Sequence, residues 1–491
     1  MAPGRGRDAG WRRMRSRFEV EMQLFRGLAT ALATMVVLVA SKPPARAETL
    51  ESALVKAYQN NPQLNAQRAS VRATDEGVSK AESGYRPKIT ASSEIGAEAL
   101  NFRSPNSSFG TSFLQPRTII QDQRLTPRGA GAQLSQMIFD SGATSNTVRQ
   151  AESLVLAARE TLRNTEQTVL FSGASTYMDV LRDTATLDLQ RSNVDVLEEQ
   201  LRQTRDRFNV GEVTRTDVAQ AESRLEGARS QVSAAQAVLK ADIATYRQII
   251  GVEPKTLAPG RPIDRLLPSS LDVAVRTALA ENPAIVSAFH NVDAAELLVK
   301  VAEAALGPNL SLNAQVQAQW DNRQSNDQLT TAQVSATLTV PIYQGGAEYA
   351  QIRQAKETLG QQRLLADQVR DQVRQLVVAA WGNLDASKAQ ILAAQAQISS
   401  SEVALNGVRE EAKVGQRTTL DVLNAQQDLL NARVALVSAE HDRVVNSYQL
   451  LEGIGRLTLE FVSPSAQKYE PGVHYQQVRD LWWGTQTPNG K

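Results

Sequence analysis

The sequence predicts a mainly α-helical fold with a small membrane β-barrel, built from a duplicated half. Each half would contain a short helix, two strands and a long helical hairpin. The chain of 491 residues is 42% hydrophobic but only 5% aromatic, which is typical of long helices. Long proline-free stretches and short segments with the alternation of strands each occur twice. These observations together predict the fold class.

The duplication rests on three pairs of similar segments that occur in the same order in both halves. The pairs are 49–64 with 270–285, 138–151 with 342–355, and 210–221 with 414–425. Four prolines within 252–268 separate the halves, so this segment cannot be helical throughout. The predicted layout is a first repeat over 48–251, a linker over 252–268, a second repeat over 269–457 and a C-terminal tail over 458–491.

The N-terminal segment has the three parts of a secretory signal peptide. Residues 1–26 carry seven arginines, the apolar stretch 27–40 follows, and Ala45-Arg46-Ala47 fits a cleavage site. The arginines could instead form a nucleic-acid-binding arm, but the apolar stretch directly after them favours export. We therefore expect residues 1–47 to be a signal peptide. No other apolar run reaches 18 residues, so the sequence predicts no membrane-spanning helix.

Each half contains a stretch of more than a hundred residues without proline and rich in strong helix formers. One Val-Gly pair interrupts each stretch, at Val210-Gly211 and at Val414-Gly415. Glycine readily adopts the left-handed conformation that ends a helix. A threonine and, three residues later, an aspartate follow each pair, which is the pattern of a helix start. The sequence therefore predicts helical hairpins over 142–251 and 345–455.

Shorter elements precede each hairpin. One short helix is expected over 49–86 and another over 270–306, because Pro87 and Pro308 close them. Period-two alternation then predicts strands at about 89–102, 129–139, 309–320 and 332–342. The strands would be joined by polar loops at about 103–128 and 321–331.

The strands have lengths that fit a tilted crossing of a bilayer. A soluble, half-buried sheet is the alternative, but export of the chain and the absence of a second sheet favour the membrane. Four strands cannot close a barrel, so several copies would have to share one. Candidate residues facing the lumen are Glu94, Glu98, Gln315 and Gln317, and the expected strand-to-helix junctions are Gly142, Pro341, Gly345 and Gly346.

The chain resembles the TolC-type outer-membrane channels of Gram-negative bacteria. The resemblance is carried by RFNVGEVTRTDV (207–218), VPIYQGG (340–346) and VGQRTTLDVLNA (414–425), and it extends over nearly all of the chain after the signal. It implies a homotrimeric α/β-barrel conduit, with a barrel in outer-membrane lipid and helices in the periplasm. It also implies two partners, a periplasmic adaptor (membrane fusion) protein and an inner-membrane transporter. The implied function is drug efflux or type I protein secretion.

The resemblance places a periplasmic aperture beside the Val-Gly turns. Arg417 and Asp421 look like the family's gate residues, and Thr216-Asp217 looks like their partner pair on the first turn. Two positions depart from the family pattern, since Asn424 replaces a second acidic residue and Ala412 replaces a tyrosine. The residues alone also allow Asp217 and Asp421 to be simple helix caps, and capping and gating are compatible.

Several classes of function are disfavoured. The chain has no cysteine and only three scattered histidines, and we expect no metal site and no cofactor. Nucleotide-binding and catalytic motifs are absent, and the charge is balanced, so neither an enzyme nor a nucleic-acid partner is indicated. An exported coiled-coil scaffold without a pore is the remaining alternative. We expect the tail from about Pro464 to wrap around the helices or to be disordered. Trp482-Trp483 could anchor at a membrane interface, although a disordered end is favoured over an anchor.

Overall fold

The computed structural model describes residues 47–105, 118–322, 324–464 and 466–488. The predicted signal peptide lies outside this part of the chain, except for its last residue. The chain divides into two units. In the small one, Glu48 pairs with Leu257 in a parallel β-bridge, and its backbone N–H donates to Thr256 O over 2.8 Å. The other unit comprises residues 50–253 and 259–491 and holds all the helices and strands described below.

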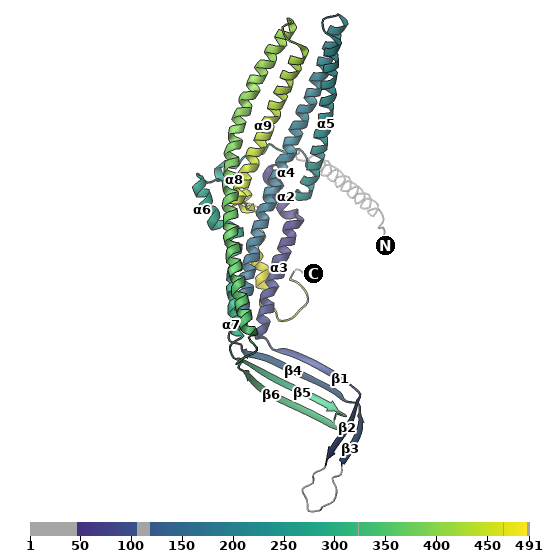
Figure 1. The fold of residues 1–491 in the computed structure, drawn as a ribbon, viewed down its shortest axis with the longest axis vertical. Coiled ribbons are helices and arrows are strands. Elements are labelled where there is room, and N and C mark those ends of the chain that lie inside the picture. Colours follow the sequence, from purple (N-terminus) through teal and green to yellow (C-terminus); the bar gives the residue numbers. More distant parts are fainter. Residues whose placement is uncertain (1–46, 106–117, 323, 465, 489–491) are drawn as a thin grey trace, which may run out of the picture. The chain divides into compact units, whose positions relative to one another are not determined.

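Both halves have the same order of elements: two short helices, strands, then two long helices (Figure 1). The first half contains α2 (Leu50–Asn60), α3 (Pro62–Glu82), β1 (Lys88–Ile95), β2 (Glu98–Pro105), β3 (Thr118–Leu125), β4 (Arg128–Phe139), α4 (Ala143–Asn209) and α5 (Arg215–Ile250). The second contains α6 (Leu271–Glu281), α7 (Pro283–Ala304), β5 (Asn309–Trp320), β6 (Gln328–Thr339), α8 (Ala347–Lys413) and α9 (Thr419–Gly453). The tail adds α10 (Leu459–Val462) and α11 (Pro471–Val478).

The prediction of one short helix at the start of each half was wrong, because an Asn-Pro pair divides it in two. Proline has no N–H to donate, and the residue before it avoids the helical conformation. Asn61 and Asn282 therefore have extended backbones, with ψ of 123° in both. Each side chain caps the helix that follows, at 2.9 Å from the N–H of Gln63 and of Ala284.

The two asparagines also tie the short helices to the long ones. Asn61 Nδ2 donates to Ile249 O over 3.1 Å, and Asn282 Nδ2 donates to Gly453 O over 2.9 Å. Both acceptors lie in the last turn of a long helix, α5 or α9. The same side chain therefore caps one helix and fixes the end of another, and the duplication repeats this contact.

The helical hairpins form as predicted. Helices α4 and α8 have 67 residues each, which corresponds to about 100 Å at 1.5 Å per residue. Each begins directly after a glycine in the left-handed conformation, Gly142 or Gly346, both with φ of 87°. Gly345 is also left-handed, with φ of 73°, and Pro341 lies just beyond the end of β6. None of the helices in the described ranges is long and apolar enough to cross a membrane.

The strands of the described chain form one sheet of four and one of two. The larger sheet has the antiparallel order β1-β4-β5-β6, and within the described residues β2 pairs only with β3. The single strand predicted at 89–102 is therefore two strands, interrupted at Gly96-Ala97. The loop predicted at 103–128 contains β3, and β6 starts at Gln328 rather than at 332 and ends at Thr339. The residues between β2 and β3 lie outside the described chain.

The larger sheet separates its side chains into an apolar and a polar face. Residues directly opposite one another across the four strands make up rows. One apolar row is Ile89, Leu134, Ala314 and Val334, and the next polar row is Thr90, Gln133, Gln315 and Gln333. Ile89 and Val334 are more than two-thirds exposed. Two-sided strands with an exposed apolar face are typical of membrane barrels.

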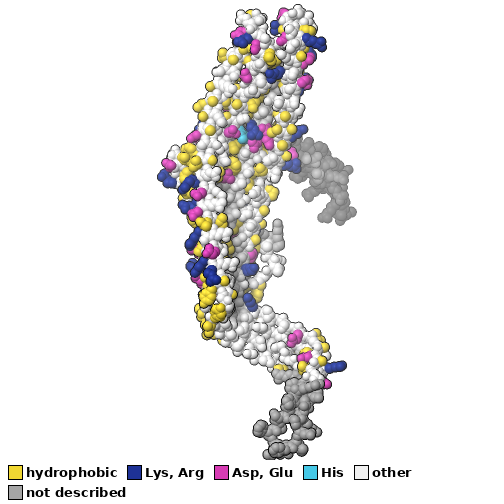
Figure 2. Space-filling view, in the orientation of Figure 1, with side chains coloured by type: hydrophobic (Ala, Val, Ile, Leu, Met, Phe, Trp, Pro, Cys, Tyr) yellow, Lys and Arg dark blue, Asp and Glu magenta, His cyan; other side chains and the backbone are white. Residues whose placement is uncertain are grey.

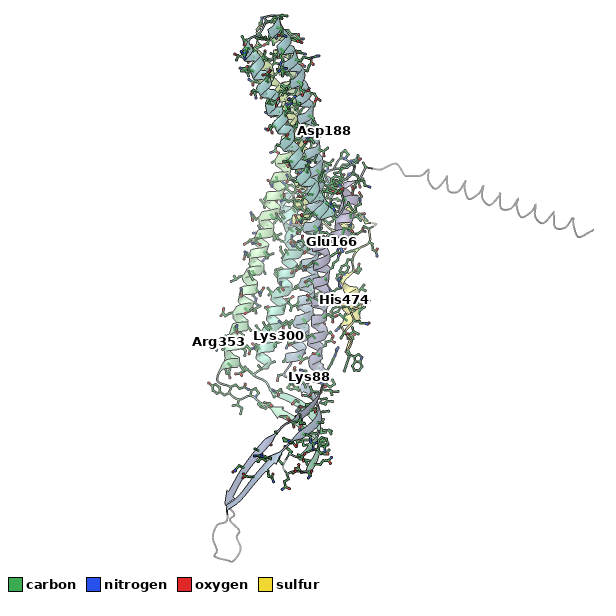
Figure 3. The ribbon with its side chains drawn as sticks, turned by 90° about the vertical axis from the view of Figure 1, so that its right-hand side faces the viewer. Lys88, Glu166, Asp188, Lys300, Arg353 and His474 are labelled. Carbon is green, nitrogen blue, oxygen red and sulfur yellow. The ribbon has the colours of Figure 1, made fainter. Side chains whose placement is uncertain are left out.

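The tail packs against the helices, which agrees with the expectation that it wraps around them and not with the alternative of disorder. Helix α11 carries His474 (Figure 3) and packs against α3. His474 Nδ1 lies 3.0 Å from Asp75 Oδ2. Asp75 is fully buried, and burial raises its pKa despite the bond to His474. Arg159 Nη2 lies 3.9 Å from the other carboxylate oxygen. A buried carboxylate needs such partners, and they join the tail to α3 and α4.

We expect Asn61→Ala and Asn282→Ala each to lower the free energy of unfolding by about 1–3 kcal/mol, because each leaves buried backbone groups without a partner. Circular dichroism at increasing urea concentration would measure this. Asn406→Ala is the matched control, since Asn406 is an exposed residue inside α8. Equal stability of all three variants would contradict the role of the Asn-Pro pairs.

Candidate functional site

The Val-Gly turns at the ends of the hairpins have nearly the same backbone geometry. Gly211 and Gly415 have φ of 83° and 79°, a conformation that costs other residues energy. Gly211 N–H donates to Phe208 O over 3.0 Å, and Gly415 N–H donates to Ala412 O over 3.3 Å. Val210 and Val414 cap α4 and α8 and are exposed. Val210-Gly211 and Val414-Gly415 therefore lie directly after the last residues of α4 and α8.

A complete capping box begins each returning helix. Thr214 and Asp217 exchange bonds of 2.8 Å and 3.3 Å at the start of α5. Thr418 and Asp421 exchange bonds of 3.0 Å and 3.2 Å at the start of α9. Bonds from the hydroxyl and N–H of Thr214 lower the pKa of Asp217, and bonds from the N–H and hydroxyl of Thr418 lower that of Asp421. Both carboxylates therefore cap helices.

An ion pair with an arginine spans each turn, but the arginine follows the glycine in the second turn and precedes it in the first. At the second turn Arg417 Nε, beyond the glycine, lies 2.8 Å from Glu411 Oε2 in α8. At the first turn the arginine is in the helix, and Arg207 Nε lies 2.9 Å from Glu212 Oε2. Both pairs are exposed, and charged side chains of both signs are visible at this end of the hairpins (Figure 2). Thr216 is exposed in the first turn of α5.

The fifth predicted site residue contacts the other hairpin. Asn424 Oδ1 in α9 accepts a hydrogen bond of 2.9 Å from Arg224 Nη2 in α5. Beside this bond Leu423 is buried against Leu197 and Leu225 of the first hairpin. Asn424 was named as a site residue because it replaces an acidic residue of the family pattern. In the structure, its side chain has a specific hydrogen-bond partner in the other hairpin. The partner could not be found from the sequence, because the two residues are 200 positions apart.

A polar cavity of about 540 Å³ lies between the hairpins behind this contact. It is lined mainly by the polar side chains and glycine of α4, α5 and α9: Gln190, Asn193, Ser223, Arg224, Gly227, Gln231, Gln426, Gln427 and Asn431. Near the turns, the hairpins are therefore not joined by continuous apolar packing.

Farther from the turns, a charged cluster that the sequence did not indicate joins three helices. His441 of α9 lies between Asp179 and Asp442, at 2.9 Å from each. Arg182 of α4 contacts Asp179 at 2.9 Å and Asp242 of α5 at 3.5 Å. Burial lowers the pKa of His441, but the bonds to Asp179 and Asp442 outweigh burial and leave the pKa raised.

The predicted lumen residues divide between the two sheets. Gln315 and Gln317 lie on the polar face of the larger sheet. Glu94 shares that face, opposite Gly129, where an added Cβ would lie 2.8 Å from its carboxylate. Glu98 begins β2 and pairs with Leu125, so the structure does not bring it into the ladder of Glu94. Within the described residues, no group of three or more His, Cys, Asp or Glu could hold a metal ion.

The charged cluster predicts a pH dependence of stability. A hydrogen bond with Asp183 raises the pKa of Asp242 to about 6, and burial adds to the shift. A raised folded-state pKa stabilises the fold at low pH, and this contribution is lost as pH rises through about 6. Wild type should therefore lose stability relative to Asp242→Asn as pH rises from about 4, near the ordinary aspartate pKa, through about 6, measured as urea midpoints. Asp428→Asn, at an exposed site in α9, should follow wild type. Equal pH slopes for wild type and Asp242→Asn would contradict the raised pKa of Asp242.

The chain is similar in sequence to outer-membrane proteins of known families. A family model described as "Outer membrane efflux protein" matches residues 53–252 and 274–456. The outer membrane efflux protein BepC of Brucella suis biovar 1 (strain 1330) is 42% identical over 473 residues, which cover 95% of this chain and 99% of BepC. TolC of Escherichia coli (strain K12) is 24% identical over 84% of this chain and 83% of TolC.

Two solved channels have the same fold. The Campylobacter jejuni CmeC outer membrane channel matches with a TM-score of 0.71 at 17% identity, over 88% of this chain and 89% of CmeC. CusC matches with a TM-score of 0.69 at 19% identity, over 83% of this chain and 92% of CusC. The family match extends over both repeats and most of the chain, and the chain belongs to the outer membrane efflux protein family.

Proposed function

We propose that this chain forms the outer-membrane channel of a tripartite export system. The channel would carry substrates from an inner-membrane transporter across the periplasm and the outer membrane. The observation that carries the proposal is an open four-stranded sheet, apolar on one face and polar on the other, continuous in sequence with two 67-residue helices. A poreless coiled-coil scaffold has no need of such strands.

The sheet requires further copies of the chain. Strands β1 and β6 are its edges, and neither has a second partner strand among the described residues. An open edge in lipid would leave backbone groups unsatisfied at several kcal/mol each. Pairing β6 of one copy with β1 of the next satisfies both edges and repeats around a ring. We propose that the ring is a homotrimer with its apolar face toward lipid and its polar face toward the lumen.

The helices extend the conduit into the periplasm. Helices of about 100 Å cannot bury their apolar stripes alone, and neighbouring copies would complete that packing. We place the aperture at the Val-Gly turns, with Arg417, Asp421, Asn424, Thr216 and Asp217 around it. A periplasmic adaptor and an inner-membrane transporter would act at this end and supply the energy for transport.

Two classes of cargo agree with the relatives. BepC is named for efflux, and AprF of Pseudomonas aeruginosa, 28% identical over 63% of this chain, is named for alkaline protease secretion. The higher identity and fuller coverage favour efflux over type I protein secretion. Comparing export of toxic small molecules with export of a protease, in cells lacking this chain, would separate the two.

The oligomer can be tested by cross-linking, because the chain has no cysteine of its own. Ile89→Cys in β1 and Leu338→Cys in β6 lie on the apolar face near the helix end of the two edges. A flexible bismaleimide should give bands of one, two and three copies when both cysteines are present. Each single-cysteine variant is the control and should stop at two copies. Bands beyond three copies, or monomer alone, would contradict a closed trimer.

The aperture can be tested by single-channel conductance in a planar bilayer. Wild type should have a small conductance, and Arg417→Ala and Asp421→Ala should raise it severalfold. The first variant removes the brace to Glu411, and the second removes the cap of α9. Asp428→Ala is the charge control, farther along α9. Equal conductance of all four proteins would place the constriction elsewhere, and no conductance from folded, inserted protein would favour the poreless scaffold.

A further inference from the structure

We propose that the C-terminal tail is a second membrane anchor, which places Trp482 and Trp483 in the lipid headgroup region of the periplasmic leaflet. The inference rests on the proposed function, because it takes the strands to lie in the outer membrane. The proposed binding partner of the two tryptophans is the headgroup region of a phospholipid bilayer, at the level where the helices end and the strands begin.

Contacts with Arg86 and Ser79 place the tryptophan pair beside the start of the first strand. Leu481 O accepts hydrogen bonds from Ser79 Oγ at 3.2 Å and from Arg86 Nη1 at 2.5 Å. The Arg86 guanidinium carbon lies 5.0 Å from the centre of the Trp482 ring. Arg86 precedes the first residue of β1 by two positions. The tail therefore ends beside the junction from which β1 begins.

The tail is held along its length, so the exposure of the tryptophans belongs to a fixed segment. Arg68 lies 4.4 Å from the ring centre of Tyr58 in α2 and 5.2 Å from that of Tyr469 in the tail. Farther along, the buried pair of His474 and Asp75 fixes α11 (Figure 3). Even so, Trp482 is 62% exposed and Trp483 is 88% exposed. Holding two large apolar rings in water has no benefit for the fold.

The residues around Trp482 and Trp483 are of the kinds found at a membrane–water interface. Hydrophobic side chains gather at the end of the helices that meets the strands (Figure 2). Exposed apolar residues at these junctions are Tyr85, Ile138, Phe139, Ile342, Tyr343 and Tyr349. Tryptophan and tyrosine favour the membrane–water boundary, where an apolar ring and a polar N–H or O–H are both satisfied.

The charges around the contact are paired. Glu82 lies 3.2 Å from Arg86 and 3.6 Å from Arg479, and Glu152 also lies 3.6 Å from Arg479. The tryptophan rings, rather than an excess of positive charge, therefore carry the proposed contact with the headgroup region. Trp320 is the last of the twelve residues of β5, and the first residue of β5 lies at the helix junction. Aromatic residues would therefore mark both ends of the strands, as in other membrane barrels.

Depth-dependent fluorescence quenching tests the anchor. The full mature chain with Trp320→Phe and Trp381→Phe retains emission from the tail pair, since Trp11 lies in the predicted signal. It would be reconstituted in vesicles of phosphatidylethanolamine and phosphatidylglycerol that contain lipids brominated at shallow or at deep acyl positions. Shallow bromines should quench the pair about two-fold more than deep ones, and acrylamide should quench it weakly. Adding Arg86→Ala should increase acrylamide quenching, because the tail loses its attachment.

Other outcomes would overturn the inference. Strong acrylamide quenching without bromine quenching would place the pair in water. Quenching by neither reagent would place it in a protein contact, such as a second copy of this chain.

A variant that retains only Trp320 (W381F, W482F and W483F) separates this inference from the proposed function. Bromine quenching of Trp320 but not of the tail pair would defeat the anchor alone. No bromine quenching of either would defeat the membrane strands and the anchor together.

Discussion

Strands β1 and β6 each leave a row of backbone N–H and C=O groups without a partner strand in the described chain. Water could satisfy these groups on a soluble sheet, but lipid cannot. An antiparallel order with two free edges, apolar on one face, can be completed by identical copies in a ring. Helix α4 follows β4 and helix α8 follows β6, in each case across a left-handed glycine. A ring of sheets would therefore arrange the long helices into a ring as well.

The two repeats show which parts of the hairpin turn are fixed by the backbone. Both turns use a left-handed glycine and a Thr-Asp capping box. Their ion pairs differ, since Arg207 and Glu411 occupy equivalent positions with opposite charge and each finds its partner across the turn. A turn of this kind needs its glycine and its cap, whereas the sign of the bracing charge is free to vary. That freedom lets the second turn present Arg417 beyond the glycine, where the first presents Val213.

Features encoded by neighbouring residues could be predicted from the sequence, and features made by distant residues could not. The hairpin ends were found because glycine, threonine and aspartate act within seven residues of one another. The Asn-Pro breaks were missed although their signal is also local, because the helix-forming residues on either side outweighed it in the prediction. Strand β3 was missed because TIIQDQRL does not alternate clearly. His441 and Asp179 are 262 positions apart, and nothing in either segment indicates the other.

The contacts between the hairpins differ in strength along the helices. About 40 Å from the turns, the cluster of His441, Asp179 and Arg182 joins α4 to α9 through several partly buried charged bonds. Near the turns, the link is one exposed bond between Arg224 and Asn424 together with the side chain of Leu423, next to a polar cavity. An exposed polar bond contributes about 1 kcal/mol and the burial of Leu423 about 1.5–3 kcal/mol, so fewer contacts resist separation of the hairpins at this end than at the cluster. In the channel proposed above, a partner could therefore move the turns without breaking the contacts at the cluster.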